Sequence, residues 1–149
     1  MSIKKSFSLI EVLIFVTILS VFLITAAAII TVSMRQNVLR INMLKAEHYN
    51  EQLLEWIKGE KEVDWNEFVA NADGAYCFLD SDIATWPIGA VDTDYCQYSL
   101  GGMYRRYAIF AEKGSPPSQV EATIITEWKE GDTASYSAKL HTLFTIWEQ

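Results

Sequence analysis

An apolar run from Phe7 to Val32 is the first pattern along the chain, and Glu11 is its only ionisable side chain. A helix of about 20 apolar residues crosses the hydrocarbon core of a bilayer, which is about 30 Å thick. At a rise of about 1.5 Å per residue, about 24 residues of this run would reach about 36 Å as a helix. The pattern therefore predicts a membrane-spanning helix over residues 7–32.

Beyond Val32 the composition becomes mixed, and neither glycine nor proline occurs before Gly59. A helix can therefore continue without interruption over residues 33–58. Apolar residues recur there at intervals of three and four, whereas charged and amide side chains such as Asn50 fall largely elsewhere. We expect the apolar stripe to pack on the chain's own head, with a coiled coil to another protein as the alternative. The stripe consists of Leu39, Met43, Ala46, Tyr49, Leu53 and Trp56.

Residues 59–149 have the patterns of a small globular head. Asp64, followed three positions later by Glu67, is typical of a helix N-terminus and predicts a short helix to about Ala72. The stretch 76–102 mixes short apolar pieces with turn residues. Three strand-like runs then follow, separated by turns that contain glycine, and they predict an antiparallel meander. These runs are Tyr104–Glu112, Gln119–Glu130 and Ser135–Trp147.

The expected fold class is therefore α+β. A long N-terminal helix, with a membrane-spanning half and an amphipathic half, would pack on a small C-terminal antiparallel β-sheet. Four segments follow from these patterns: residues 1–6 as a leader, 7–32 as the span, 33–58 as the amphipathic continuation of the helix, and 59–149 as the head.

The net charge of the chain is -7, from 12 Lys plus Arg and 19 Asp plus Glu. This balance argues against a surface that neutralises phosphate without sequence preference, so nucleic acid is not an expected partner. Two basic pairs stand out, Lys4-Lys5 ahead of the apolar run and Arg105-Arg106 between Tyr104 and Tyr107. We interpret the second pair as an ordinary solvated strand face, because two charges neutralise too few phosphates to bind alone.

The two leader lysines orient the predicted span. Positive residues tend to stay on the cytoplasmic side, which places Met1–Ser6 in the cytoplasm and exports the rest, although Arg35 and Arg40 compete with this bias. A cleaved secretory signal has an apolar core of only about 7 to 15 residues, so this run is too long for one. An ordinary signal anchor explains the run but leaves the costly carboxylate of Glu11 at membrane depth without a reason.

The segment Lys4–Ile14, KKSFSLIEVLI, resembles the class III signal of type IV prepilins and of the prepseudopilins of type II secretion systems. That signal combines a short basic leader, a small residue before the cut, an aromatic first mature residue and a glutamate at the fifth mature position. The resemblance implies cleavage by a prepilin peptidase between Ser6 and Phe7, and N-methylation of Phe7. The chain departs from the family at one position, since the family usually has glycine where Ser6 stands.

Cleavage before Phe7 would create an α-amino group four residues ahead of Glu11. Positions i and i+4 share a helix face, so the carboxylate could meet a cation at the same membrane depth. That cation is the chain's own terminus or, as the resemblance implies, the terminus of a neighbouring subunit during assembly. Glu11 is therefore the expected assembly residue. Removing one member of such a desolvated pair should impair incorporation.

Cys77 and Cys96 are the only cysteines, and an even count in an exported head permits one pairing. We expect a disulfide between them. It would close a loop of about 20 residues and stabilise the head by about 3 kcal/mol on the chain-entropy model. Two buried thiols in a reducing compartment are the alternative.

The sequence contains no recognisable catalytic motif. The only histidines, His48 and His141, lack the spacing of zinc ligands, and neither a phosphate-binding glycine loop nor a nucleophile elbow occurs. We expect no enzyme activity, no catalytic residue and no cofactor. Some related pseudopilins hold calcium in a head loop, so the acidic residues between the cysteines are candidate Ca²⁺ ligands, against the alternative of a solvated loop. They are Asp80, Asp82, Asp92 and Asp94.

The C-terminal pattern adds a looser resemblance, because Trp128–Asp132 between two predicted strands, closing near Trp147, is similar to the sheet of minor pilins and minor pseudopilins. The resemblances imply a structural subunit, preferably a minor one, of a type IV pilus, type II secretion or competence filament. The implied partners are other pilin or pseudopilin subunits, a prepilin peptidase, the inner-membrane assembly platform and, before assembly, membrane lipid. The implied location is a single pass in the cytoplasmic membrane with the head outside, and then a cell-surface or periplasmic filament.

Two other functions stay open. In the first, the head captures DNA, a surface or a secreted substrate, and the candidate patch consists of Tyr104, Arg105, Arg106 and Tyr107. In the second, the chain is a plain signal-anchored extracellular protein and the resemblance around Glu11 is coincidental.

Overall fold

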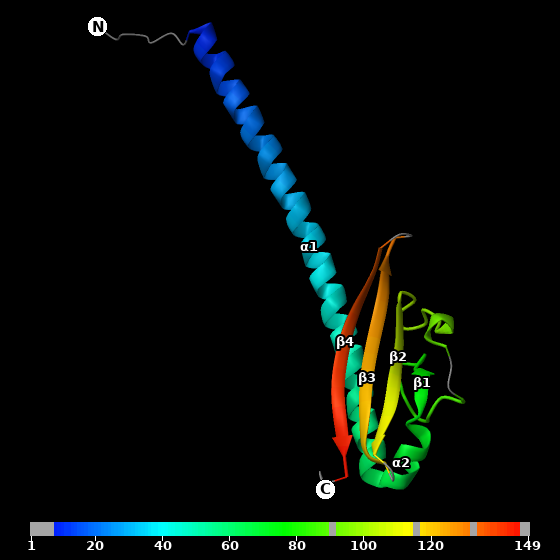
Figure 1. The fold of residues 1–149 in the computed structure, drawn as a ribbon. Coiled ribbons are helices and arrows are strands. Elements are labelled where there is room, and N and C mark those ends of the chain that lie inside the picture. The colour runs from blue at the N-terminus through cyan, green and yellow to red at the C-terminus, as the bar shows by residue number, and fades with distance from the viewer. Residues whose placement is uncertain (1–7, 90–91, 115–116, 132–133, 147–149) are drawn as a thin grey trace. The chain divides into compact units, whose positions relative to one another are not determined.

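The computed structural model describes residues 8–89, 92–114, 117–131 and 134–146 (Figure 1). The chain forms two compact units, Met1–Ile41 and Asn42–Gln149. Helix α1, Leu9–Val63, begins in the first unit and ends in the second. The first unit contains only helix among its described residues after Ser8, and the second contains the remaining helices and the sheet.

Helix α1 continues past the predicted end near Lys58 and through Gly59 to Val63. A glycine in a helix interior costs only about 1 kcal/mol relative to alanine, and a cap signal decides more strongly where a helix stops. That signal is Asp64, whose side chain accepts hydrogen bonds from the backbone N–H groups of Asn66 at 2.8 Å and Glu67 at 3.1 Å. Asp64 thereby starts helix α2, Trp65–Asn71, which confirms the predicted short helix.

The sheet has four antiparallel strands in the order β1-β2-β3-β4 (Figure 1). The predicted meander is confirmed as β2, β3 and β4, whereas β1 follows the turn at Gly74 and was not predicted. The α+β fold class is thus the observed one. The strands are β1 Gly74–Cys77, β2 Tyr104–Gly114, β3 Pro117–Glu130 and β4 Ala134–Thr145.

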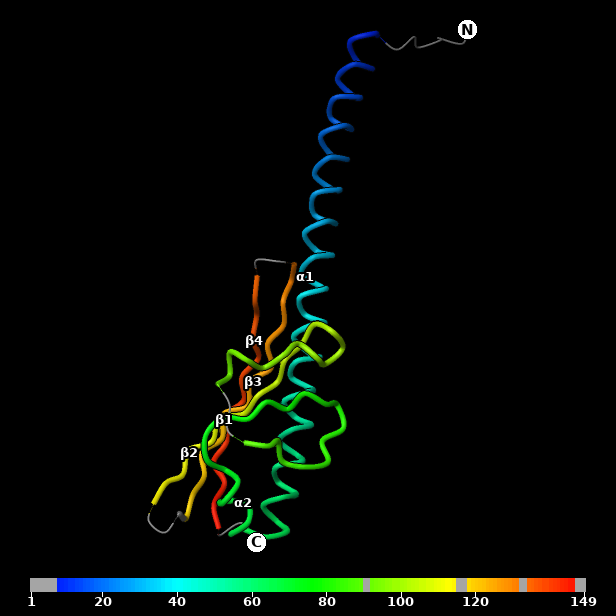
Figure 2. Tube along the Cα trace, turned by 90° about the vertical axis from the view of Figure 1, so that its right-hand side faces the viewer, coloured from blue at the N-terminus to red at the C-terminus, as the bar shows by residue number. Residues whose placement is uncertain are grey.

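Within the second unit, the last part of α1 runs along one face of the sheet, as the turned view in Figure 2 shows. Leu53 and Ile57 of α1 are fully buried in the main core cluster together with strand residues. Alternate residues of β3 are buried on the face of the sheet that α1 covers. The buried residues of that face are Val120, Ala122, Ile124, Thr126 and Trp128.

The buried face of α1 is more polar than the predicted stripe. Met43, which was assigned to the stripe, is 48% exposed, and Asn50, which was assigned away from it, is 2% exposed. The predictions for Met43 and Asn50 were wrong, because a hydrophobicity pattern does not show that Asn42 and Asn50 are hydrogen-bonded on the buried face of α1. Asn50 donates to the carbonyl of Ala138 at 3.1 Å and accepts from Thr126, and Tyr104 donates to Oδ1 of Asn42 at 3.0 Å.

The predicted disulfide is present between Cys77 at the end of β1 and Cys96, which follows the 3-10 helix η1, Thr93–Tyr95. The two Cα atoms lie 5.5 Å apart. We call residues 78–95 the disulfide loop, of which all but residues 90–91 are described. Its first part packs against α1, because Phe78 and Trp86 both contact the ring of Trp56.

Candidate functional site

The apolar segment of α1 is exposed around its whole circumference. Five successive side chains, Val12–Val16, are each at least 50% exposed, and successive helix positions turn by about 100°. A helix that is apolar on every side belongs inside a protein or a membrane rather than in water. By length and composition, α1 is able to cross a membrane.

The hydroxyl groups of this segment are satisfied within the helix itself. Thr17 donates to the carbonyl of Ile14 at 2.8 Å and Ser20 to that of Val16 at 2.7 Å. Thr25 and Thr31 bond in the same way, to carbonyls three or four residues earlier. Such bonds to the preceding turn leave no hydroxyl in need of water, as a hydrocarbon environment requires.

Glu11 is the exception in this segment. It lies in the first turn of α1, where a negative charge interacts favourably with the helix dipole, and its side chain is exposed. Among the described residues, no hydrogen bond or ion pair involves its carboxylate. The predicted cleavage and N-methylation positions, Ser6 and Phe7, lie outside the described residues, as do the two leader lysines.

In the head, the interpretation of Arg105-Arg106 as a solvated strand face is wrong. Arg106 is 0% exposed, Tyr104 2% and Tyr107 7%, and the side chain of Arg105 is only 17% exposed. The physical reason is that this part of β2 is covered on both faces, by α1 on one and by residues around the disulfide on the other. These four residues therefore do not form the exposed patch expected for capture of DNA or a surface.

Arg106 links three parts of the head through backbone carbonyls. Its guanidinium donates to the carbonyl of Tyr49 in α1 at 2.9 Å and to that of Asp80 in the disulfide loop at 2.7 Å. Among the described residues no carboxylate pairs with it, and its Nε has no hydrogen-bond partner. Burial lowers the pKa of Arg106 to about 10. This buried side chain therefore connects parts of the fold by hydrogen bonds and is not exposed to bind a ligand.

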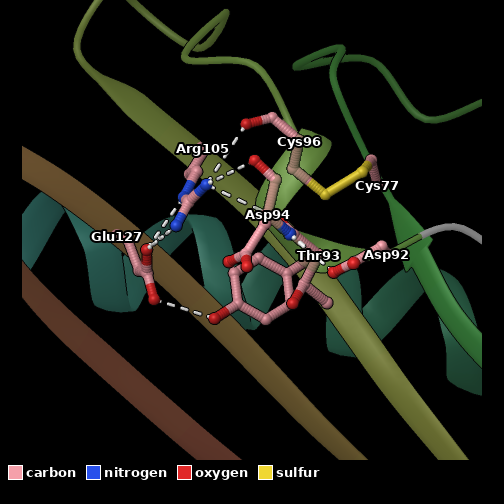
Figure 3. Close-up of polar contacts among 8 residues, drawn as sticks. Cys77, Asp92, Thr93, Asp94, Cys96, Arg105 and Glu127 are labelled. Atoms are coloured by element: carbon pink, nitrogen blue, oxygen red, sulfur yellow. Dashed lines mark hydrogen bonds and ion pairs between the residues drawn. A yellow bond between two sulfur atoms is a disulfide. The ribbon is translucent and has the colours of Figure 1, made fainter.

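Arg105 points to the opposite face of the sheet and contacts the other end of the disulfide loop (Figure 3). It pairs with Glu127, its register partner on β3, through Nη2 at 2.7 Å and Nε at 2.8 Å. Its Nη1 donates to the carbonyls of Thr93 at 3.4 Å, Asp94 at 3.5 Å and Cys96 at 3.5 Å. Burial lowers the pKa of Arg105, but the hydrogen bond and charge of Glu127 outweigh this effect and leave the pKa raised.

Tyr107 completes this cluster, because its hydroxyl donates to Oε1 of Glu127 at 2.8 Å. Burial, followed by that hydrogen bond and the negative charge, raises the pKa of Tyr107 well above its ordinary value of 10.0. Arg105, Glu127 and Tyr107 together are called the clasp below. Glu127 carries no local signal in the sequence, although the antiparallel register of the predicted hairpin would place it opposite Arg105.

The four candidate calcium ligands do not form a common site. The side chain of Asp92 caps η1 by accepting from the backbone N–H of Asp94 at 3.1 Å, and Asp80 and Asp82 are exposed elsewhere in the loop. Within the part of the chain that the structure describes, no three His, Cys, Asp or Glu side chains gather as a metal site would need. The calcium hypothesis gains no support from this geometry.

No family model, no curated protein and no solved structure matches the chain. The features that bear on function are therefore those of the chain itself. These are an apolar helix with one carboxylate and a disulfide-bonded α+β head.

Proposed function

We propose that the chain is a structural subunit of a type IV pilin-like filament, preferably a minor subunit, in a pilus, type II secretion or competence system. It enters the cytoplasmic membrane as a single-pass precursor with its N-terminus in the cytoplasm and its head outside. A prepilin peptidase removes residues 1–6, and the subunit then joins the filament through the apolar part of α1.

The single observation that carries this proposal is the contrast between Glu11 and its neighbours. Each hydroxyl group between Leu9 and Val32 is satisfied by its own helix, whereas the carboxylate has no partner among the described residues. An ionisable side chain in a membrane segment costs about 2.5 to 3.5 kcal/mol at the bilayer centre and usually marks a function. A terminal amino group created at Phe7 would supply the missing partner.

A plain membrane anchor would not need this carboxylate. An anchor requires length and apolarity, and valine or leucine at position 11 would supply both at lower cost. A filament subunit does need it, because a charge that is satisfied only by another subunit fixes the axial position of one helix against the next. The carboxylate, which is unpaired among the described residues of an otherwise apolar segment, therefore favours a filament subunit over a plain membrane anchor.

The test is to determine the N-terminus of the mature chain. The full chain is produced in cells with a prepilin peptidase and, separately, with a peptidase inactivated at its catalytic residues. Intact mass and N-terminal peptide mass are then measured on protein from the membranes. We expect a chain that begins at N-methyl-Phe7 only with the active peptidase.

A Ser6→Gly variant is the matched control, because it restores the residue that the resembled signal usually has before the cut. It should be processed at least as fast as the parent chain. If both chains keep Met1–Ser6 while a glycine-bearing prepilin is processed in the same cells, the filament proposal fails. The signal-anchored extracellular protein is then the better account.

A further inference from the structure

The disulfide joins two cysteines that are both positioned by strand β2. Cys77 belongs to β1 and is paired in register with Tyr107, and the next residue, Phe78, donates its N–H to the carbonyl of Arg106 at 2.9 Å. Cys96 lies outside the sheet strands, after η1. Backbone pairing therefore explains the position of Cys77 but not that of Cys96.

Arg105 adds a polar contact on the Cys96 side, where Cys96 is also buried against Tyr107 and where Ser99 donates to the carbonyl of Leu79 at 2.6 Å. Nη1 of Arg105 lies within hydrogen-bond distance of three carbonyl oxygens at the end of η1, including that of Cys96 itself. Glu127 binds the other edge of the same guanidinium (Figure 3). Tyr107 in turn donates to Glu127. A planar guanidinium can serve both edges at once, whereas a lysine ammonium presents a single point of charge.

None of these contacts uses a cysteine sulfur atom. The clasp can therefore form while both thiols are reduced, and it is mostly removed from water, since the side chains of Arg105 and Glu127 are each 17% exposed. The bonds between Arg105 and Glu127 are short and charge-assisted, whereas the three carbonyl contacts of Nη1 are long, at 3.4 to 3.5 Å, and act together. The ring of Tyr98, two residues after Cys96, also lies under Arg105, at 5.2 Å from the guanidinium carbon.

We infer that Arg105 is a positioning residue for oxidative folding: held by Glu127 and Tyr107, it brings Cys96 to Cys77 before the sulfur–sulfur bond forms. The disulfide then locks a loop end that is already docked. The reaction partner is a small disulfide such as oxidised glutathione. One cysteine thiolate attacks it and releases one glutathione thiolate, and the second cysteine thiolate attacks the mixed disulfide and releases the other. The two cysteines lose two electrons and two protons, and glutathione disulfide becomes two thiols.

The first experiment measures how strongly the folded chain favours disulfide closure. The full chain in detergent micelles is equilibrated in buffers of reduced and oxidised glutathione, free thiols are trapped by alkylation, and the oxidised fraction is read by mass. This gives the effective concentration of one cysteine thiol near the other. Arg105→Gln should lower that concentration by about tenfold or more, the factor expected for losing hydrogen bonds to a charged group.

The chain offers a matched control in Lys113, which forms an exposed cross-strand ion pair with Glu121 between the same two strands. Lys113→Gln should leave the effective concentration within about twofold of the parent value, because exposed pairs contribute little. Arg105→Lys keeps the charge opposite Glu127 but loses the planar fork, so it should resemble Arg105→Gln. If Arg105→Gln does not fold, as loss of the near-ultraviolet circular dichroism of the head would show, Arg105→Lys is used in its place. An unchanged effective concentration in the Arg105 variants overturns the positioning role.

The second experiment tests the order of events without any sulfur chemistry. In a Cys77→Ser/Cys96→Ser chain, the amide hydrogens at positions 95 and 96, which close η1 onto Asp92 and Thr93, should remain protected from exchange. Adding Arg105→Gln should remove that protection, and adding Lys113→Gln should not. Loss of protection in the cysteine-free chain alone would show that the disulfide creates the docked loop, which contradicts the inference. Neither experiment depends on filament assembly or on processing at Phe7.

Discussion

The hydroxyl of Thr126 donates a hydrogen bond of 2.7 Å to Oδ1 of Asn50, and both side chains are buried between strand β3 and helix α1. The amide of Asn50 also donates to the carbonyl of Ala138 in β4. One helix residue thus links two neighbouring strands of the sheet, at a depth where an unpaired polar group is costly.

Asn50→Ala should destabilise the head by about 2 to 4 kcal/mol, because it leaves the Thr126 hydroxyl and a strand carbonyl without partners in the core. Denaturant unfolding of the full chain in micelles, followed by tryptophan fluorescence, measures this. Glu51→Ala, at an exposed position on the same helix, serves as the control and should change the free energy of unfolding little. In a double-mutant cycle with Thr126→Val, strict additivity would contradict a direct interaction.

Arg106 provides a second prediction, because its two hydrogen bonds compete with the cost of burying its charge. Arg106→Lys keeps the buried charge but cannot reach both carbonyls, and should destabilise the head by about 1.5 to 3 kcal/mol. Arg106→Met also loses both bonds, yet it removes the desolvation penalty and keeps the volume, so it should destabilise the head less than the lysine variant. The opposite order in denaturant unfolding would show that a positive charge at this position is stabilising.

The raised pKa of Tyr107 leads us to expect that the free energy of unfolding falls at alkaline pH. Below pH 10 the phenol carries its proton in both the folded and the unfolded chain, so its hydrogen bond to Glu127 contributes in full, about 1 to 3 kcal/mol. Above pH 10 the unfolded chain ionises Tyr107 first, because the pKa in the folded state is raised. The contribution is therefore lost as the pH rises toward the folded-state pKa.

The comparison that isolates this effect is the difference in free energy of unfolding between the parent chain and Tyr107→Phe. That difference should be constant between pH 7 and pH 9 and shrink above about pH 10. Tyr76, Tyr104 and Arg106, whose pKa values are also shifted, titrate in both proteins and cancel. A difference that stays the same at alkaline pH would mean that Tyr107 ionises alike in both states.

Glu11 gives the prediction that bears on assembly. Glu11→Gln and Glu11→Ala should each lower the fraction of the chain recovered in sheared filaments by about tenfold or more, because a buried ion pair that loses one member leaves an uncompensated charge. Ser20→Ala is the matched control, since that hydroxyl already bonds within its own helix. Normal incorporation of both Glu11 variants, at equal membrane levels, would remove this residue from the assembly mechanism.

The parts of the fold that were predictable from sequence are those whose signal is local. The β-branched and aromatic residues of β3 identify it as a strand, and Asp64 marks the start of α2 through its own side chain. Strand β1 has only four residues, all of intermediate exposure, and therefore carries no alternation to detect.

The errors arose where distant segments meet. Arg105 and Arg106 look solvent-exposed in a local strand pattern, but the residues around the disulfide cover Arg105, and α1, 57 residues away at Tyr49, covers Arg106. Asn50 looks polar and outward-facing until Thr126, 76 residues away, supplies its partner. For the candidate sites, local sequence predicted the cysteine pair, which is confirmed, and the assembly role of Glu11, which stays a prediction. It could not identify the clasp, because that cluster depends on strand register.

The hydroxyl groups of the apolar segment bond within their own helix, so their hydrogen bonds do not depend on which kind of apolar neighbour surrounds the helix. Thr17, Ser20, Thr25 and Thr31 keep the same partners whether lipid tails or other helices lie alongside. A transfer of the helix from lipid to a helical neighbour breaks none of these hydrogen bonds and leaves no hydroxyl without a partner. Glu11 is then the one ionisable side chain between Leu9 and Val32, so its energy depends on whether a cation lies at the same depth near the start of the helix.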